Sequence, residues 1–395
     1  MNQQKDETIH ILVLLSLIGL LGELDYQLIP PLLPLLAKDF HVAPGYGGRV
    51  VTVYSLSSAF FSLLFGSLSD RFGRRPFILL GLVGFSITAF LIRYAGSMEI
   101  FFLLRFLSGM ATGAIVPSTT SLAADYFRYQ HRGRAMGILS VPYFVAAIIG
   151  IPLATFAAST WGWRPIFLLI SAAALGCALR VYGTLPDPSR SEETQKLPEL
   201  KRLHQVWVRI VRRRDLLSIL VASVLSSSAI VGFITYLGSH LVVDRHISVK
   251  QVGLVYLFCG VASVFGAPLS GILSDKWAKR PVLVLSGVIL AVCFGFIPLL
   301  SWSFWLFVVL GVAGLSISFR IAPFLALTTE LVLSHERGTV LALRGALAQL
   351  GIALTTYLAS YAMLSKGFYF VGQIVALELF LSSALVYFFV KEPET

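Results

Sequence analysis

The 395-residue sequence has few charged residues, few cysteines and a single asparagine. Charged residues make up 13% of the chain and hydrophobic residues 56%, which excludes an ordinary soluble domain. Cys177, Cys259 and Cys293 all fall inside apolar segments, so we interpret them as packing residues and predict neither a disulfide framework nor a metal site. Asn2 is the only asparagine, so the chain contains no N-glycosylation sequon.

The chain also lacks the short motifs that carry enzymatic chemistry or nucleotide binding. It contains no Walker-type phosphate loop, no catalytic triad and no pair of zinc-ligand motifs. We therefore predict a protein that is not an enzyme and needs no cofactor. If it moves a solute, the energy must come from a gradient, because no ATP site is predicted.

What the sequence does contain is twelve long apolar runs. A bilayer core requires about 20 apolar residues in a helix, and each run approaches or exceeds that length. The runs show no period-two alternation, and a helix satisfies its own backbone hydrogen bonds in hydrocarbon. They span residues 10–36, 47–68, 76–96, 99–126, 134–158, 163–184, 215–243, 250–274, 281–301, 303–333, 338–363 and 367–390. The sequence predicts an all-α membrane protein with twelve transmembrane helices.

The net charge of +11 suggests a nucleic-acid partner at first, but its distribution indicates a membrane topology instead. Most basic residues lie in the even-numbered connectors between runs. The connector 185–214 alone contains eight of them. Because cytoplasmic loops carry excess Lys and Arg, both termini are predicted to be cytoplasmic. We expect a multi-pass protein of the plasma membrane, in keeping with a bacterial inner membrane, and no nucleic-acid partner.

Two similar polar motifs interrupt the apolar runs. "GSLSDRFGRRPF" occupies 66–77 and "GILSDKWAKRPV" occupies 271–282, an offset of 205 that recurs at Asp125/Glu330 and Arg132/Arg337. The offset predicts two six-helix halves in tandem, 1–184 and 215–395, joined by a cytoplasmic linker, 185–214, with a basic amphipathic helix. A repeat of this kind is typical of transporters, with the site between the halves near mid-depth.

These motifs resemble those of the major facilitator superfamily over essentially the whole chain. "GSLSDRFGRRP" resembles the signature between helices two and three, and "RFLSGMATGA" from Arg105 resembles the helix-four motif. "LDYQLIPPLLP" from Leu24 resembles the helix-one motif of drug:proton antiporters, whereas "IIGIPLATFAAS" departs from the helix-five antiporter motif. The resemblance implies two pseudo-symmetric halves, alternating access, and a monomer that handles a small-molecule substrate and protons within the lipid bilayer.

The resemblance also implies a conformational latch at the cytoplasmic face. Asp70 would bind the start of helix eleven, Arg74 would pair with Asp125, and Lys279 would pair with Glu330. Asp275 would cap the start of helix five. The predicted latch residues are Gly66, Asp70, Arg71, Gly73, Arg74, Arg75, Asp125, Asp275, Lys279, Arg280, Glu330, Arg337 and Arg344. The alternative is simple orientation by positive charge and a tight turn.

Three ionisable residues near the middle of the first half are candidates for proton coupling. Charges at mid-depth are costly unless paired or hydrated, and burial favours the protonated carboxyl. Glu23 and Asp25 are two residues apart, about 200° around a helix, so both cannot face one cavity. Arg105 is the natural partner for one of them. The alternative is that one or both acids are structural.

The second half contributes the candidates for substrate binding. Arg320 and Glu378 have no counterparts at the 205 offset, and positions that break the symmetry are where specificity is expected. The alternative is a structural Arg320–Glu378 pair. Aromatic residues of central helices that could line the cavity are Tyr26, Tyr143, Tyr236 and Phe324.

Four functions fit these features. The leading hypothesis is proton-coupled efflux of small amphipathic molecules. The first alternative is a symporter or uniporter of a metabolite or organic anion, in which Arg105 and Arg320 hold the anion. A lipid or lysolipid transporter and a non-transporting sensor on the same scaffold are the others.

Overall fold

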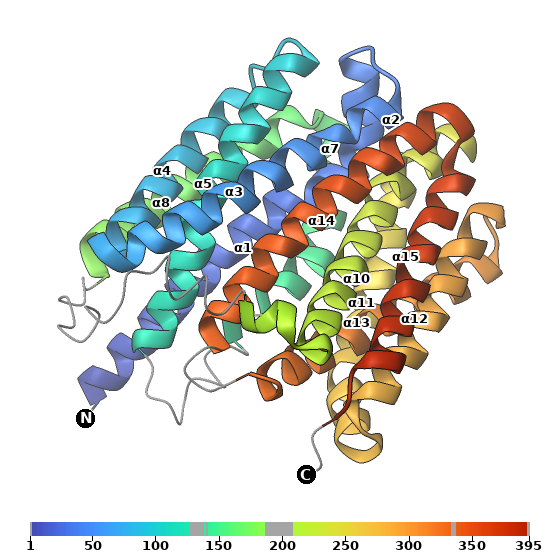
Figure 1. Cartoon of the computed structure of the whole chain (residues 1–395). Helices are drawn as coiled ribbons and strands as arrows, with labels where there is room; N and C mark the ends of the chain where they lie inside the picture. Colours follow the sequence, from blue (N-terminus) through green and yellow to red (C-terminus); the bar gives the residue numbers. More distant parts are fainter. Residues whose placement is uncertain (1, 127–137, 140, 186–207, 333–336, 393–395) are drawn as a thin grey trace.

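The computed structural model describes residues 2–126, 138–139, 141–185, 208–332 and 337–392. These residues form helices, turns and short extended segments, with no strand among them. Within the described residues, twelve helices are long and apolar enough to cross a membrane, which confirms the predicted all-α fold. Figure 1 shows them as a single bundle of helices running up and down, with both chain ends at its lower side.

The first six spans occupy the N-terminal part of the chain. Their helices are α1 (Asn2–Asp39), α2 (Pro44–Gly47), α3 (Arg49–Phe72), α4 (Arg74–Ile92), α5 (Met98–Tyr126), α7 (Ile151–Trp161) and α8 (Arg164–Thr184). The fifth span, Val141–Trp161, contains the π-helical turn η1 (Ala146–Gly150). This turn coincides with the stretch whose sequence departs from the antiporter motif.

The last six spans follow residues 208–213. Their elements are α10 (Arg214–Ser239), the π-helical turn η3 (His240–Asp244), α11 (Val249–Trp277), α12 (Lys279–Phe296), the 3₁₀ turn η4 (Ile297–Leu299), α13 (Phe304–Glu330), α14 (Arg337–Lys366) and α15 (Phe368–Phe389). Most of the predicted amphipathic helix lies outside the described residues. Residues 208–212 are helical, with Ile210 buried and Val211 exposed.

The two polar motifs form equivalent one-residue connectors. Gly73 separates α3 from α4 with φ 96° and ψ 149°, and Ala278 separates α11 from α12 with φ 81° and ψ 152°. This backbone region is nearly restricted to glycine, because a Cβ atom clashes with the neighbouring peptide groups. The second half therefore adopts the same turn with a residue that is strained in it.

The same internal symmetry is present where helices cross within each half. A Cβ on Gly109 of α5 would lie 2.4 Å from the carbonyl oxygen of Tyr54 in α3. A Cβ on Gly314 of α13 would lie 2.6 Å from the carbonyl oxygen of Cys259 in α11. Both glycines and both carbonyl residues are 205 apart. Small residues allow membrane helices to approach closely, so the repeat preserves a close helix–helix contact in each half.

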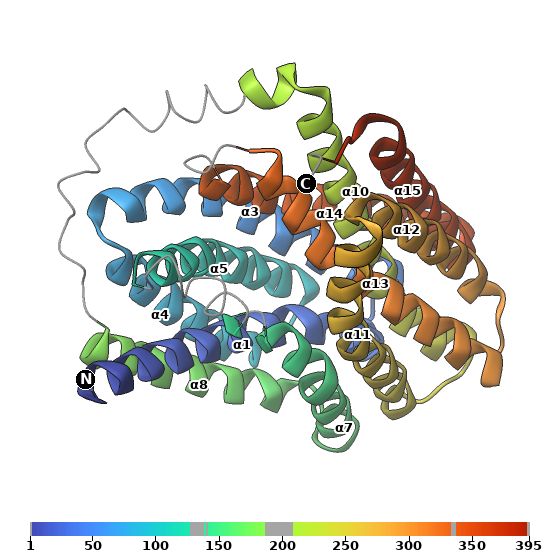
Figure 2. The ribbon, with the colours of Figure 1, turned by 90° about the horizontal axis from the view of Figure 1, so that it is seen from below.

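The halves contact each other along a small set of helices. We call the end of the bundle at which α1 begins and α15 ends the terminal side, and the opposite end the far side (Figure 1). Between the halves, α3 packs against α14, α1 against α10, and η1 and α7 against α11. Figure 2, viewed from the terminal side, shows the helices of the first half mainly on the left and those of the second half mainly on the right, with α14 beside α3.

Candidate functional site

The middle of α1 presents two acids to different surroundings. The side chain of Asp25 is 1% exposed and faces α5, where Arg105 Nη1 lies 2.7 Å from both of its carboxylate oxygens. Arg105 is also 1% exposed. The bond pairs the two charges where neither can be hydrated, so Asp25 and Arg105 form a buried ion pair inside the first half.

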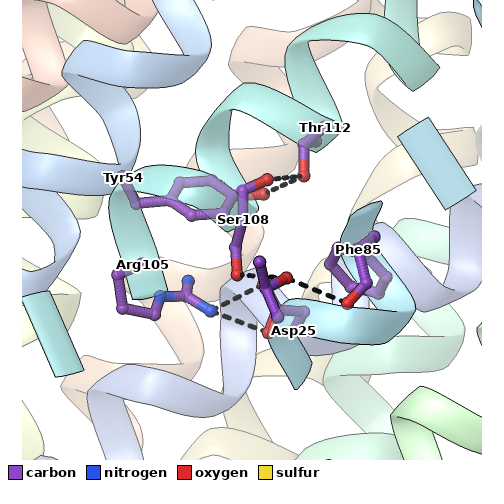
Figure 3. Close-up of polar contacts among 7 residues, drawn as sticks. Asp25, Tyr54, Phe85, Arg105, Ser108 and Thr112 are labelled. Atoms are coloured by element: carbon purple, nitrogen blue, oxygen red, sulfur yellow. Dashed lines mark hydrogen bonds and ion pairs between the residues drawn. The ribbon is translucent and has the colours of Figure 1, made fainter. Parts of the chain in front are cut away.

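Aromatic and hydroxyl groups surround this pair (Figure 3). The guanidinium carbon of Arg105 lies 4.4 Å from the ring centroid of Tyr54, whose hydroxyl donates to Thr112 Oγ1 at 2.9 Å. Ser108 donates to Thr88 Oγ1 at 3.1 Å. These contacts join α1, α3, α4 and α5, which fixes the orientation of the ion pair.

Glu23 lies on the other face of α1 and is half-buried. Gln27 Nε2 donates to Glu23 Oε2 at 2.8 Å and also lies 3.3 Å from the carbonyl oxygen of Tyr143. No described cation forms an ion pair with Glu23. A Cβ on the neighbouring Gly22 would have no atom within 4 Å, so this part of α1 borders open space.

Two of the predicted aromatic residues lie beside Glu23. Tyr26, one turn further along α1, is half-buried and its ring centroid is 5.5 Å from that of Tyr54. Tyr143 is half-buried on the fifth span and touches the Glu23–Gln27 pair through its carbonyl group. Glu23, Tyr26, Gln27 and Tyr143, which we call the α1 face, thus combine an acid, an amide and two aromatic rings at mid-depth.

Arg320 of α13 lies inside the second half and is 2% exposed. Its Nε donates to Ser226 Oγ at 2.6 Å, Nη1 to the carbonyl oxygen of Leu283 at 2.8 Å, and Nη2 to Ser382 Oγ at 2.8 Å. All three acceptors are neutral, and the alternative Arg320–Glu378 ion pair is not formed in the described residues. A role for Arg320 in substrate binding stays a prediction.

Glu378 of α15 is half-buried, and its hydrogen-bond partners among the described residues are both hydroxyl groups. Thr355 Oγ1 of α14 donates to Oε1 at 2.6 Å, and Ser228 Oγ of α10 lies 3.3 Å from Oε2. The two remaining aromatic candidates lie elsewhere. Phe324 is buried 5.1 Å from the guanidinium carbon of Arg320, and Tyr236 is buried near the far side.

The far side is closed by contacts between the halves, which the sequence reasoning did not anticipate. Arg49 Nε of α3 donates to Ser360 Oγ of α14 at 2.9 Å. Its guanidinium carbon lies 5.0 Å from the ring centroid of Tyr46 and 5.3 Å from that of Tyr357. One turn further along α3, Thr52 Oγ1 lies 2.8 Å from Thr356 Oγ1 of α14.

Tyr236 completes this closure from α10. Its hydroxyl donates to the carbonyl oxygen of Thr356 at 2.9 Å, and a Cβ on Gly48 would lie 2.2 Å from its ring. We call Arg49, Thr52, Tyr236, Thr356 and Ser360 the far-side gate. The sequence does show Arg49 as a basic residue at the start of a span, which could have marked it as a candidate. Nothing in the sequence identified its partners.

The predicted latch residues lie on the terminal side. Lys279 Nζ is 3.0 Å from Glu330 Oε1, and Arg74 Nη2 is 3.0 Å from Asp70 Oδ1. The Lys279–Glu330 pair joins α12 to α13 within the second half and is formed while the far side is closed. The side chains of Asp125 and Asp275 lie outside the described residues. The latch therefore stays a prediction.

Several other latch candidates contact groups inside their own half. Arg75 and Arg280, 205 apart, donate to the carbonyl oxygens of Tyr182 and Tyr387, which are also 205 apart. The remaining contacts are Gly66 beside Pro117, Arg71 against the ring of Phe72, Arg337 bonded to the carbonyl oxygen of Thr329 and Arg344 bonded to Ser223 Oγ.

Glu392 is a terminal-side residue that sequence reasoning missed. Its Oε1 accepts from the backbone N–H groups of Lys279 and Arg280, so it caps the start of α12. The repeat could have identified this residue, because Asp187 lies 205 residues before Glu392 and each of the two acids precedes a proline.

Comparison with known proteins agrees with this architecture. The chain is 26% identical over 341 residues to an uncharacterized MFS-type transporter of Bacillus subtilis, YceJ, with 85% of each protein covered. It is 25% identical over 284 residues to the bicyclomycin resistance protein homolog of Haemophilus influenzae, with 72% of this chain and 71% of that protein covered. The crystal structure of a D-xylose-proton symporter matches with a TM-score of 0.79 at 17% identity over 98% of both chains, a likeness in fold alone.

The family itself is identified by a match along nearly the whole sequence. The Major Facilitator Superfamily matches residues 15–356 and 238–395. The described residues supply twelve candidate spans, and no group of His, Cys, Asp and Glu among them could hold a metal ion. The chain belongs to the Major Facilitator Superfamily of membrane transporters.

Proposed function

We propose that this protein exports small, cationic amphipathic molecules by alternating access, in exchange for protons. The observation that carries the proposal is the α1 face, where Glu23 is half-buried, follows a glycine that borders open space, and has Gln27 as its one side-chain hydrogen-bond partner among the described residues. An ionised carboxylate of this kind attracts a cation, and aromatic rings nearby favour an amphipathic one.

The charge pattern supports a cationic substrate over an anionic one. The anion-binding alternative relied on Arg105 and Arg320, and both are at most 2% exposed and bonded inside their own halves. Asp25 is neutralised by Arg105, which leaves Glu23 as the acid in the middle of α1 that a proton and a cation can both approach. Competition for one carboxylate is the simplest means of exchanging the two.

A second candidate function rests on Arg344. It is half-buried on α14, and its Nε donates to Ser223 Oγ at 3.1 Å. A membrane-embedded arginine with a neutral partner suits an organic anion. However, Arg344 lies seven residues after the start of α14, nearer the terminal side than the α1 face, so we rank anion transport second.

The proposed cycle uses the far-side gate as one of two barriers. With both termini in the cytoplasm of a bacterial inner membrane, the far side is external and the closed gate corresponds to an inward-facing state. A cation then binds the α1 face, the gate opens while the terminal side closes, and an external proton displaces the cation. We expect the monomer to be the functional unit.

The test is dye transport in proteoliposomes with an imposed pH gradient. Wild-type protein should move a cationic dye in the direction opposite to the flow of protons down their gradient. Glu23→Gln should abolish this gradient-driven transport. Glu99→Gln, which removes an exposed acid at the start of α5, is the matched control and should transport normally. If wild-type protein moves organic anions and no cationic dye, the second candidate function replaces the first.

A further inference from the structure

We propose that Glu378 is a second proton-binding group of the transport cycle and that its charge controls closure of the far-side gate. This inference rests on the proposed proton coupling, but it assigns a separate carboxyl, in the other half and on a different helix. No cofactor or substrate is needed for the effect, because the carboxyl acts through hydroxyl contacts that are part of the fold.

The carboxylate of Glu378 joins three helices. It projects from α15 and accepts from Thr355 of α14 at 2.6 Å, and it lies 3.3 Å from Ser228 Oγ of α10. The hydroxyl of Ser228 also lies 2.9 Å from the carbonyl oxygen of Val224 and 3.1 Å from that of Leu225, so its single proton is shared among three acceptors. Thr355 has no other hydrogen-bond partner among the described residues, which makes it the main donor to Glu378.

Thr355 is directly adjacent to the gate. The next residue, Thr356, lies 2.8 Å from Thr52 of the first half, and its carbonyl oxygen accepts from Tyr236. Because Thr356 Oγ1 donates to the carbonyl oxygen of Ile352 at 2.7 Å, its bond with Thr52 uses the proton of Thr52. The position of α14 at residues 355 and 356 thus determines both the contact with Glu378 and the contact across the halves.

No described charged group neutralises Glu378 by an ion pair. The nearest cationic contact on α15 is Arg320, which donates to Ser382, one turn further along the helix. The titratable and charged residues of the elements packed against α15 belong to α10 with η3, α12 and α14: Arg214, Asp215, Tyr236, His240, Asp244, Lys279, Arg280, Cys293, Arg337, Arg344, Tyr357, Tyr361 and Lys366. None of them contacts the carboxylate, so its charge depends on protonation.

The expected effect of pH on the gate follows from how strongly the ionised and the protonated carboxyl of Glu378 accept hydrogen bonds. Hydrogen bonds to an ionised carboxylate are about twice as strong as bonds between neutral groups. Ionised Glu378 therefore holds α14 against α15 and α10 in the arrangement in which the gate is closed. Protonation weakens these bonds, so acidification should favour the state in which the gate is open, and opening should in turn favour proton binding.

The experiment measures opening of the far side directly, without substrate. Gly96→Cys and Ser301→Cys place one spin label on a far-side connector of each half, in protein whose three native cysteines are replaced by alanine. Double electron–electron resonance spectroscopy then gives the distance between the two labels in nanodiscs. The measurement is repeated from mildly alkaline to mildly acidic pH. We expect acidification to increase the population with the longer distance. Glu378→Gln should favour the longer distance at every pH.

Matched variants separate this effect from other titrating groups. Thr355→Ser keeps the hydroxyl and should keep the pH-dependent shift, whereas Thr355→Val should lose most of it. His240→Gln removes the histidine that pairs with Asp244 near the gate, and it should retain the shift. A full shift in Glu378→Gln, or no shift in wild-type protein, would overturn the inference.

The measurements distinguish a failure of this inference from a failure of the proposed export. If wild-type protein moves no cationic dye but the distance responds to pH through Glu378, the export function fails and the assignment of Glu378 stands. If dye transport depends on Glu23 and the distance is unaffected by Glu378→Gln, the export function stands and the assignment of Glu378 fails.

Discussion

Glu23 and Asp25 lie two residues apart on α1, yet one is bonded to Gln27 and the other is paired with Arg105 in the interior of the first half. The helical rotation of about 200° between them separates the two carboxyls completely. Asp25, which matches the helix-one motif, is the buried one. We propose that Asp25 fixes the packing of the first half and that Glu23 carries the exchangeable proton.

The Asp25–Arg105 pair makes a prediction about stability. Arg105→Met leaves the carboxylate of Asp25 buried without a cation, and breaking a buried pair in this way costs about 3–5 kcal/mol. The unfolding temperature of Arg105→Met in detergent should be much lower than that of wild-type protein. Adding Asp25→Asn to Arg105→Met should recover part of the lost unfolding temperature. Glu23→Gln should change the unfolding temperature little. Equal unfolding temperatures for Arg105→Met and wild-type protein would contradict the paired arrangement.

The connector between α11 and α12 predicts a stabilising substitution. Ala278 has φ 81°, a conformation that costs a non-glycine residue on the order of 1–3 kcal/mol. Ala278→Gly should relieve most of this strain and raise the unfolding temperature. Gly73→Ala, at the equivalent connector, is the reciprocal variant and should lower it. Opposite shifts in the two variants are the diagnostic result, and a decrease in both would argue against strain at Ala278.

Gly287 is predicted to be required for the position of Arg320. A Cβ on Gly287 would lie 2.1 Å from Arg320 Nη1 and 2.1 Å from Ser383 Oγ. Gly287→Ala should therefore displace the guanidinium group and cost about 1–3 kcal/mol, as overpacking does. Gly295→Ala, on the same helix, is the control, because its Cβ would have no atom closer than 3.9 Å. Calorimetry of both variants tests the difference.

The contacts of Arg49 predict a shift in the equilibrium between states. Arg49→Gln removes the guanidinium group that lies between Tyr46 and Tyr357, so the gate should open more often. The distance between labels at residues 96 and 301 should lengthen relative to the otherwise unaltered protein. Arg93→Gln removes a far-side arginine whose aromatic contact, Tyr94, is within its own half, and it should leave the distance unchanged. A response to Arg93→Gln alone would refute the role of Arg49.

Much of the fold was predictable because it depends on local chemistry. Runs of about 20 apolar residues become membrane helices since a helix satisfies its own backbone groups in hydrocarbon. The offset of 205 located the equivalent connectors at Gly73 and Ala278, because a duplicated half repeats its local geometry, and the family resemblance placed the Lys279–Glu330 contact. The same offset could have located Glu392, whose counterpart is Asp187.

The site was only partly predictable. The sequence by itself determined the helices, the repeat and the presence of acids at mid-depth, since these depend on composition and spacing along one chain. The direction in which Glu23 and Asp25 point, the neutral partners of Arg320 and the closure of Arg49 and Thr52 on α14 were decided by the tertiary structure. These features depend on the rotation of each helix and on which helices of the two halves meet, and packing sets both across separations of up to about 300 residues.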